Sequence, residues 1–160
     1  MHTAVISHLH RDHIGGLPEL SNANIVISDA EWQTLNKPRP EARGLLRSHI
    51  DRPGLRWQRI DPQALADPTL APFTNGHDLF GDGSMVLFPT PGHTPGSQSM
   101  LVRRPGRVPL LLVEDLTYDV DPLTDGLSPQ GPRDSVTSSD PLFGTARTLA
   151  GLTGSEPATP

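Results

Sequence analysis

Four side chains that can bind a metal ion fall within six consecutive residues: His8, His10, Asp12 and His13. They directly follow residues 3–7, an apolar and β-branched run that predicts a short strand. In an extended segment, side chains two residues apart point the same way, so His8 and His10 can converge on one ion. If the chain then turns into a helix, Asp12 and His13 can hold a second ion. The cluster predicts a metal site at the end of a strand.

The ligand types in the sequence restrict the choice of metal. None of the 160 residues is Cys, which excludes disulfides and thiolate metal sites. Imidazole nitrogen and carboxylate oxygen suit Zn²⁺, with Mn²⁺ and Fe²⁺ as competitors. Zn²⁺ is therefore the expected cofactor.

Composition excludes other classes of function. The 13 Lys and Arg against 18 Asp and Glu give a formal net charge of −5, which argues against nucleic-acid binding through phosphates. No apolar run approaches the roughly 18 residues that cross a bilayer, and the first residues do not resemble a signal peptide. A cytoplasmic protein that contacts neither membrane nor nucleic acid is expected.

The pattern along the chain predicts a mixed α/β (α+β) fold of short strands and helices. Ser28 and Glu31 match a capping box, in which each side chain bonds to the other's backbone amide, and predict a helix at 29–36. The continuous apolar run at 108–113 predicts a buried strand. Further strands are expected at 24–27, 55–60, 84–88 and 97–103, a second short helix at 41–50, and a loop up to residue 72.

The last 35 residues differ in composition from the rest. Gly, Pro, Ser and Thr make up 20 of them, a content that buries too little apolar surface to offset the entropy of ordering. We therefore expect one domain over residues 1–125 and a disordered tail over 126–160.

Two later segments add candidate ligands. His93 lies in the loop TPGHTPG (90–96), and Asp115 follows the apolar run in VED (113–115). Each residue alone is more typical of an ordinary loop. Together with SHLHRDHIGGL (7–17), however, the two segments resemble, in order and spacing, three signatures of the metallo-β-lactamase superfamily. The resemblance covers about residues 3–125.

This resemblance implies a four-layer αββα sandwich and two metal ions. It places His8, His10 and His93 on the first ion and Asp12, His13 and Asp115 on the second, with Asp115 bridging both. Tyr118 lies three residues after Asp115, as in N-acyl homoserine lactonase-like members, in which a Tyr hydroxyl faces the substrate carbonyl. A partly exposed loop Tyr remains an equal alternative.

The chain departs from the family pattern in three places. Only seven residues precede His8, whereas several strands precede the first signature in the family. An incomplete (truncated) sandwich with an uncovered sheet edge and apolar faces is therefore expected. No His follows His93 to complete the second metal site. Glu114 stands where the family commonly has Gly, and its charge repels that of Asp115 unless a metal or an outward turn relieves it.

The implied activity is metal-dependent hydrolysis of a small-molecule lactone, ester or thioester by a metal-bound hydroxide. In this scheme Asp12 carries the proton to the leaving alkoxide. Two alternatives remain: a truncated, inactive relic that binds one ion or none, and a glyoxalase II-like thioesterase, because GHTPGS (92–97) occurs in that branch too. Whether the chain is an active enzyme, and its oligomeric state, stay open at this point.

Overall fold

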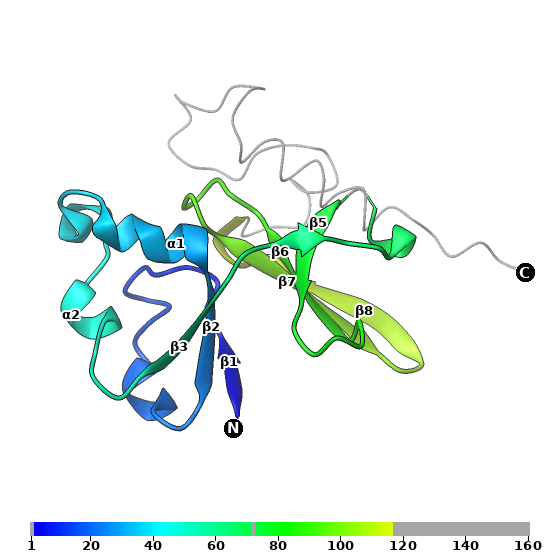
Figure 1. Ribbon diagram of the computed structural model, residues 1–160, viewed down its shortest axis with the longest axis horizontal. Coiled ribbons are helices and arrows are strands. Elements are labelled where there is room, and N and C mark those ends of the chain that lie inside the picture. Colours follow the sequence, from blue (N-terminus) through cyan, green and yellow to red (C-terminus); the bar gives the residue numbers. More distant parts are fainter. Residues whose placement is uncertain (1, 72, 117–160) are drawn as a thin grey trace, which may run out of the picture.

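The computed structural model describes residues 2–71 and 73–116 of the chain. Within them two β-sheets pack together, and helices cover the outer face of one sheet (Figure 1). The first sheet is parallel and contains β1 (Thr3–Val5), β2 (Asn24–Ser28) and β3 (Arg56–Ile60) in that order. The second is antiparallel and contains β4 (Gln63–Ala64), β5 (Asn75–Asp78), β6 (Met85–Pro89), β7 (Gln98–Arg104) and β8 (Arg107–Leu112). The predicted mixed α/β class is confirmed.

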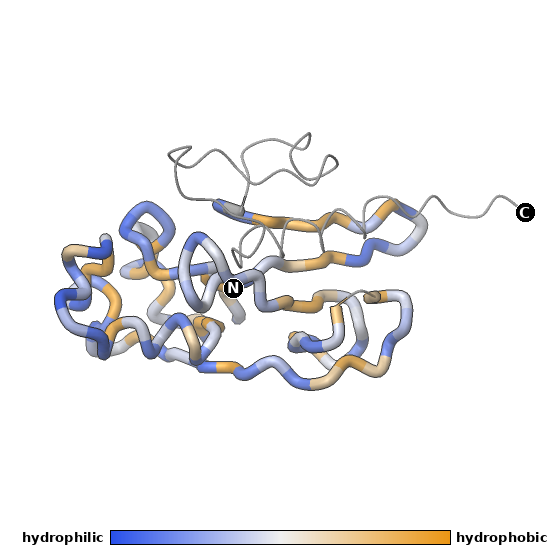
Figure 2. The backbone as a smooth tube through the Cα atoms, turned by 90° about the horizontal axis from the view of Figure 1, so that it is seen from above, coloured by the Kyte–Doolittle hydropathy of each residue, from blue (hydrophilic) through white to orange (hydrophobic). Residues whose placement is uncertain are grey.

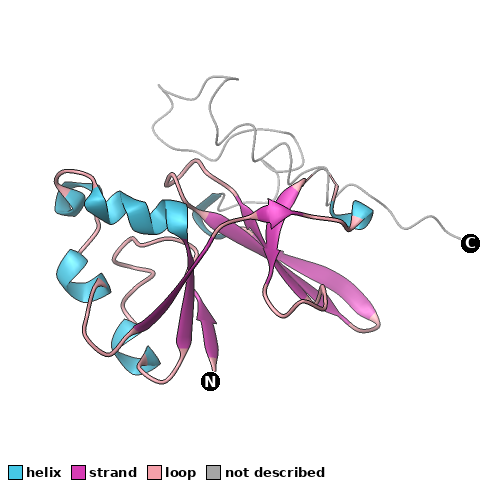
Figure 3. Ribbon diagram, in the orientation of Figure 1, coloured by secondary structure: helices cyan, strands magenta, loops and turns pink. Residues whose placement is uncertain are grey.

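The helical segments are short and lie mostly between strands of the parallel sheet (Figure 3). Within the described ranges the α-helices are α1 (Asp29–Gln33) and α2 (Arg47–Ile50). The 3₁₀ turns are η1 (Leu17–Leu20), η2 (Thr34–Asn36), η3 (Pro40–Arg43), η4 (Pro68–Leu70) and η5 (Glu114–Leu116).

Local chemistry explains where these helices begin and end. The Ser28 hydroxyl accepts a hydrogen bond from the Glu31 amide at 3.0 Å, which confirms the predicted start of α1. The helix continues as η2, so the two elements together fill the expected range of 29–36. The helix expected at 41–50 is instead divided into η3 and α2. Gly44 divides it, because its left-handed backbone (φ of 79°) ends η3.

Strand β2 carries the core on both faces, as is typical of a covered parallel sheet. Ile25 and Ile27 pack on the helical side, in a cluster that includes Leu9, Leu35 and Ile50. Val26, between them in β2, points to the other side and packs between the sheets against Ile60 of β3 and Leu87 of β6. Figure 2 shows hydrophobic stretches alternating with hydrophilic turns along the chain.

Strand β6 connects the inter-sheet layer to the outer face of the antiparallel sheet. Leu87 faces the parallel sheet, whereas Val86 and Phe88 face outward. The Phe88 ring stacks on Phe73, with ring centroids 4.2 Å apart, and Leu70 covers the same cluster. Periodicity missed β4 and β5, which fall in or after the predicted loop and pair antiparallel with each other.

Strand β8 corrects one prediction. It lies where a buried strand is expected at 108–113, but Val108, Leu110 and Leu112 are 80%, 43% and 40% exposed. The strand is at the edge of its sheet, and among the described residues only its other face, with Leu111, packs on the core. A continuous apolar run cannot tell a strand covered on both faces from one covered on a single face.

Two predictions about the organisation of the chain fall outside residues 2–71 and 73–116. They are the end of the domain at residue 125 and the tail at 126–160. In the described part of the chain, no helix has the length and apolar character needed to cross a membrane.

We expect Leu87→Ala to lower the free energy of unfolding by about 2–5 kcal/mol, because it leaves a cavity between the sheets. Val108→Thr is expected to change it by less than about 0.5 kcal/mol, because Val108 is 80% exposed. Urea unfolding followed by circular dichroism measures both values. Equal losses for the two variants would show that the Val108 face of β8 is covered in solution.

Candidate metal centre

The N-terminal histidine segment, residues 8–13, leaves the carboxyl end of β1. The Ile6 amide donates to the Val26 carbonyl at 2.9 Å, so the chain follows β2 until it reaches His8. A tight turn then forms, in which the His13 amide donates to the His10 carbonyl at 3.0 Å. This turn, and not the helix considered from the sequence, turns the chain after His10 and brings His13 back beside His8, with ring centroids 4.0 Å apart.

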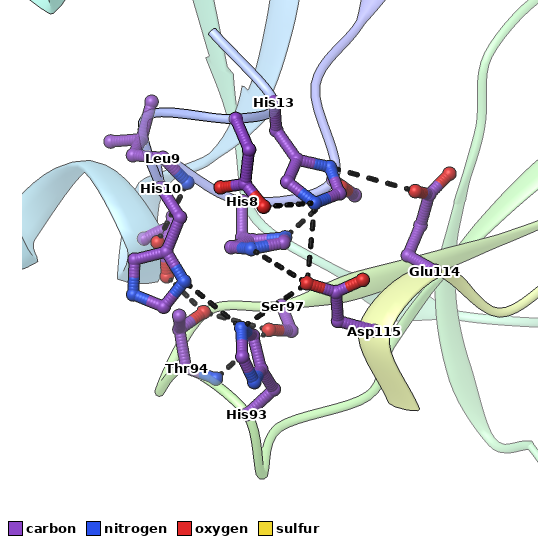
Figure 4. Close-up of polar contacts among 12 residues, drawn as sticks. His8, Leu9, His10, His13, His93, Thr94, Ser97, Glu114 and Asp115 are labelled. Atoms are coloured by element: carbon purple, nitrogen blue, oxygen red, sulfur yellow. Dashed lines mark hydrogen bonds and ion pairs between the residues drawn. The ribbon is translucent and has the colours of Figure 1, made fainter. Parts of the chain in front are cut away.

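The first group of candidate ligands joins two distant segments. His8, His10 and His93 each offer one ring nitrogen, and these nitrogens lie within 4.8 Å of one another. Nδ1 of His10 is 2.9 Å from Nε2 of His93, 83 residues away in the sequence. Figure 4 shows the three rings turned toward a common centre. The structure thus brings together the three residues that the sequence assigns to the first ion.

The second group is centred on Asp115. His8, His13 and Asp115 also offer atoms within 4.8 Å of one another. Oδ2 of Asp115 is 3.2 Å from Nε2 of His13 and 3.7 Å from Nε2 of His8. The same oxygen lies 3.5 Å from Nε2 of His93, so it contacts members of both groups. This position agrees with the bridging role that the family resemblance implies.

Asp12 is the predicted ligand that joins neither group. Its Oδ2 is 3.8 Å from Nε2 of His13, but the side chain is 70% exposed. By these distances the third member of the second group is His8, and the Asp12 carboxylate lies at the edge of the group beside Nε2 of His13. Tyr118 lies outside the described residues.

Glu114 avoids Asp115 by turning outward. Its Oε2 lies 3.7 Å from Nδ1 of His13, and its side chain is 40% exposed. The backbone of Glu114 has a φ of 51°, in the left-handed region that Gly adopts without steric cost. This conformation gives a physical reason why a Gly suits the position.

Burial and neighbouring rings control the charge of the cluster. Burial, reinforced by the imidazoles of His13, His10 and His93, lowers the pKa of His8 from 6.5 to about 4. Burial also lowers the pKa of His93, with His10 as the next cause. A hydrogen bond to its own backbone amide holds the pKa of Asp12 below its usual value. At neutral pH the His8 side chain is therefore uncharged and the Asp12 side chain is ionised.

The donor set fits a zinc-like cation. Nε2 of His8 is buried and has no hydrogen-bond partner within the described part of the chain, which is unusual for a buried polar atom. Ser7 Oγ lies 3.2 Å from Nδ1 of His8 and 3.4 Å from Nδ1 of His13, so the opposite nitrogen of each ring faces the centre. An imidazole and carboxylate set of this kind is typical of Zn²⁺.

Glu31 is a site residue that the sequence analysis missed. Its side chain is fully buried and does not return to the Ser28 amide as the capping box predicts. Its Oε1 accepts from the Leu9 amide at 3.0 Å, and its Oε2 accepts from the Thr94 hydroxyl at 2.7 Å and the Gly96 amide at 3.1 Å. These partners are 22 to 65 residues away, so no local pattern identifies them.

The loop that carries His93 packs tightly against α1. A Cβ atom at Gly96 would lie 2.0 Å from the backbone nitrogen of Glu31, so only glycine permits this approach. The Ser28 hydroxyl donates to the Gly96 carbonyl at 2.6 Å and thus holds the same contact from the other side.

A pocket of about 250 Å³ opens beside His10 and His93. Arg43 forms part of its wall and is held there by hydrogen bonds to the carbonyls of Thr34 and Pro38. The remaining wall contains Lys37, Leu45 and Pro95. A small organic molecule can therefore reach the histidine cluster through a cavity with both apolar and cationic walls.

Comparison with known proteins agrees with this geometry. A family model described as the metallo-beta-lactamase superfamily matches residues 2–139. The N-acyl homoserine lactonase AttM of Azorhizobium caulinodans is 36% identical over 159 residues, which cover 97% of this chain and 56% of that protein. AttM of Rhizobium radiobacter is 38% identical over 123 residues, covering 73% of this chain and 41% of that protein.

Solved structures show the same fold. A quorum-quenching N-acyl homoserine lactone hydrolase has a TM-score of 0.67 at 20% identity and covers 94% of this chain and 52% of its own. A second such hydrolase, with N-hexanoyl-L-homoserine bound at its catalytic metal centre, has a TM-score of 0.62 at 22% identity, covering 94% of this chain and 49% of its own. The chain spans about half the length of the curated relatives that it matches. Because the family match extends over most of the sequence, the chain belongs to the metallo-beta-lactamase superfamily.

Proposed function

We propose that this chain, alone or as part of a longer protein, hydrolyses N-acyl homoserine lactones with bound Zn²⁺. The observation that carries the proposal is the convergence of His8, His10, His13, His93 and Asp115 into two overlapping ligand groups. The similarity to two proteins named N-acyl homoserine lactonase supports the choice of substrate.

In this proposal each residue has a defined task. His8, His10 and His93 would hold the first ion, and a set of three protein ligands is typical of catalytic zinc sites. Asp12, His13 and Asp115 would hold the second ion, because Nε2 of His8 is used by the first ion and one imidazole nitrogen binds a single ion. Bound Zn²⁺ supplies a Lewis acid and lowers the pKa of water toward 7.

Asp12 and Tyr118 are assigned to the movement of protons and the positioning of substrate. The Asp12 carboxylate is exposed at the edge of the cluster, 3.8 Å from Nε2 of His13, and its lowered pKa keeps it ionised at neutral pH. It is therefore placed to accept a proton and deliver it to the leaving alkoxide. The Tyr118 hydroxyl is proposed to donate a hydrogen bond to the substrate carbonyl, a contact worth about 3 kcal/mol in other enzymes.

The pocket beside His10 and His93 is the proposed place for the acyl chain. Its volume of about 250 Å³ and its apolar contacts, Leu45 and Pro95, suit a short acyl group. A thioester with the same acyl group would fit the same cavity. Glyoxalase II-like thioesterase activity is therefore the second candidate.

We expect the zinc-loaded chain to open N-hexanoyl homoserine lactone, measured by the acid released. His10→Ala and removal of metal with EDTA are each expected to reduce the rate to the uncatalysed background, because both destroy the first ligand group. His49→Gln, at an exposed position outside the cluster, is the matched control and is expected to retain the rate.

Other outcomes of this experiment would favour another activity or an inactive protein. A faster reaction with an S-acyl glutathione thioester would favour the thioesterase candidate. About two zinc ions per chain support the enzyme, whereas one or none, together with a background rate, would support an inactive relic. Hydrolysis that persists with EDTA would contradict the proposed mechanism.

The proposed ligands bind a metal ion as neutral imidazoles. The low pKa of His8 makes the free energy of unfolding of the metal-free chain depend on pH. The pKa of His8 is about 4 in the folded chain against 6.5 for an exposed imidazole. Between these two values the unfolded chain binds more protons than the folded chain. The contribution of neutral His8 to the free energy of unfolding is therefore fully present above about pH 6.5 and is lost as the pH falls toward 4.

We expect the free energy of unfolding in EDTA to decrease between pH 6.5 and 4.5. His8→Gln is expected to make this slope shallower, by up to about 1.4 kcal/mol per pH unit, the value for one proton. His49→Gln is expected to keep the original slope. Identical slopes for all three proteins would show that His8 does not titrate abnormally.

A further inference from the structure

We propose that Glu31 is a positioning residue that holds the two histidine loops at the spacing needed for metal binding. The inference rests on the proposed metal site, and it concerns a side chain that lies in neither ligand group. Glu31 is fully buried, and no cationic side chain in the described ranges forms an ion pair with it. Burying a carboxylate without a cationic partner costs several kcal/mol unless hydrogen bonds replace water.

Three hydrogen-bond donors replace that water, and they come from two separate loops. The Leu9 amide, between His8 and His10, donates to Oε1 at 3.0 Å. The Thr94 hydroxyl, directly after His93, donates to Oε2 at 2.7 Å. One carboxylate therefore sets the separation between the backbone segments that carry all three ligands of the first group.

A third bond and a steric contact make this arrangement rigid. The Gly96 amide donates to Oε2 at 3.1 Å, and the backbone of Gly96 lies so close to that of Glu31 that no side chain fits between them. The Thr94 hydroxyl also lies 2.7 Å from the Ser97 hydroxyl, which fixes its direction. Displacement of Glu31 would therefore move His93 relative to His10.

Glu31 is not the only connection between the two loops. The Gln98 side chain donates to the Ile6 carbonyl at 2.9 Å, and the backbone amide of Gln98 donates to the Ser7 carbonyl at 3.2 Å. These bonds hold β7 beside the end of β1 without the help of Glu31. A variant that disturbs only the carboxylate is therefore expected to retain the fold while the geometry of the first group loosens.

Glu31→Gln is the direct test, because it keeps the shape but places an amide NH₂ opposite at least one of the three donors. We expect this variant to bind Zn²⁺ about 10- to 100-fold more weakly than the original chain, the range seen when residues behind metal ligands are changed. Competition with a chelating dye measures the affinity. Glu19→Gln is the matched control, since it removes the same charge at an exposed position in η1 and is expected to bind normally.

A second pair of variants removes the donor instead of the acceptor. Thr94→Val deletes the hydroxyl that bonds to Oε2 and is expected to weaken Zn²⁺ binding in the same direction. Thr94→Ser keeps the hydroxyl and is expected to restore the affinity. If Glu31→Gln fails to fold, as judged by circular dichroism and a cooperative melt in EDTA, this pair decides the question.

The outcomes separate this inference from the proposed function. Original affinity in both Glu31→Gln and Thr94→Val, or equal weakening in Thr94→Val and Thr94→Ser, would overturn the positioning role. A chain that binds Zn²⁺ and shows the expected Glu31 effect but leaves N-hexanoyl homoserine lactone intact would overturn only the proposed function. A chain that binds no Zn²⁺ would overturn both.

Discussion

The buried carboxylate of Glu31 is the constraint on which the geometry of the histidine cluster depends. It lies on α1, between the loop after β1 and the loop before β7, and bonds to the backbone of both. Removing a charge from water is unfavourable, so this side chain is tolerated only while all of its donors are in place. The two loops must therefore close on Glu31 together. Because those loops carry His8, His10 and His93, the packing around Glu31 also determines where these three side chains lie.

The sequence predicts which candidate ligands come together, because they lie in short, chemically unusual segments. His8, His10 and His93 come together as expected, and Asp115 lies among them. It predicts the supporting contacts poorly. The capping-box pattern places the Glu31 side chain on a neighbour in its own helix, whereas the folded chain offers it three donors from distant loops.

The other differences between the predicted and the observed structure have equally specific causes. A run of apolar residues in β8 indicates a strand but not how many of its faces are covered, so the exposure of Val108 needs the neighbouring elements to be known. The division of the second predicted helix depends on the left-handed backbone at Gly44. Asp12 is 70% exposed and lies in neither ligand group, although its Oδ2 is 3.8 Å from Nε2 of His13. Each of these outcomes is decided by geometry that a pattern of residue types does not contain.

The tip of the β7–β8 hairpin combines two opposing properties. Its Val108, Leu110 and Leu112 side chains are exposed, and within the described residues β8 is an edge strand, which a second strand can pair with. Arg104 and Arg107 stand opposite each other at the same end, and two hairpins that approached edge to edge would bring these charges together. Electrostatic repulsion of this kind weakens within about 10 Å at 0.1 M salt. Higher ionic strength would therefore weaken the repulsion between two such strands.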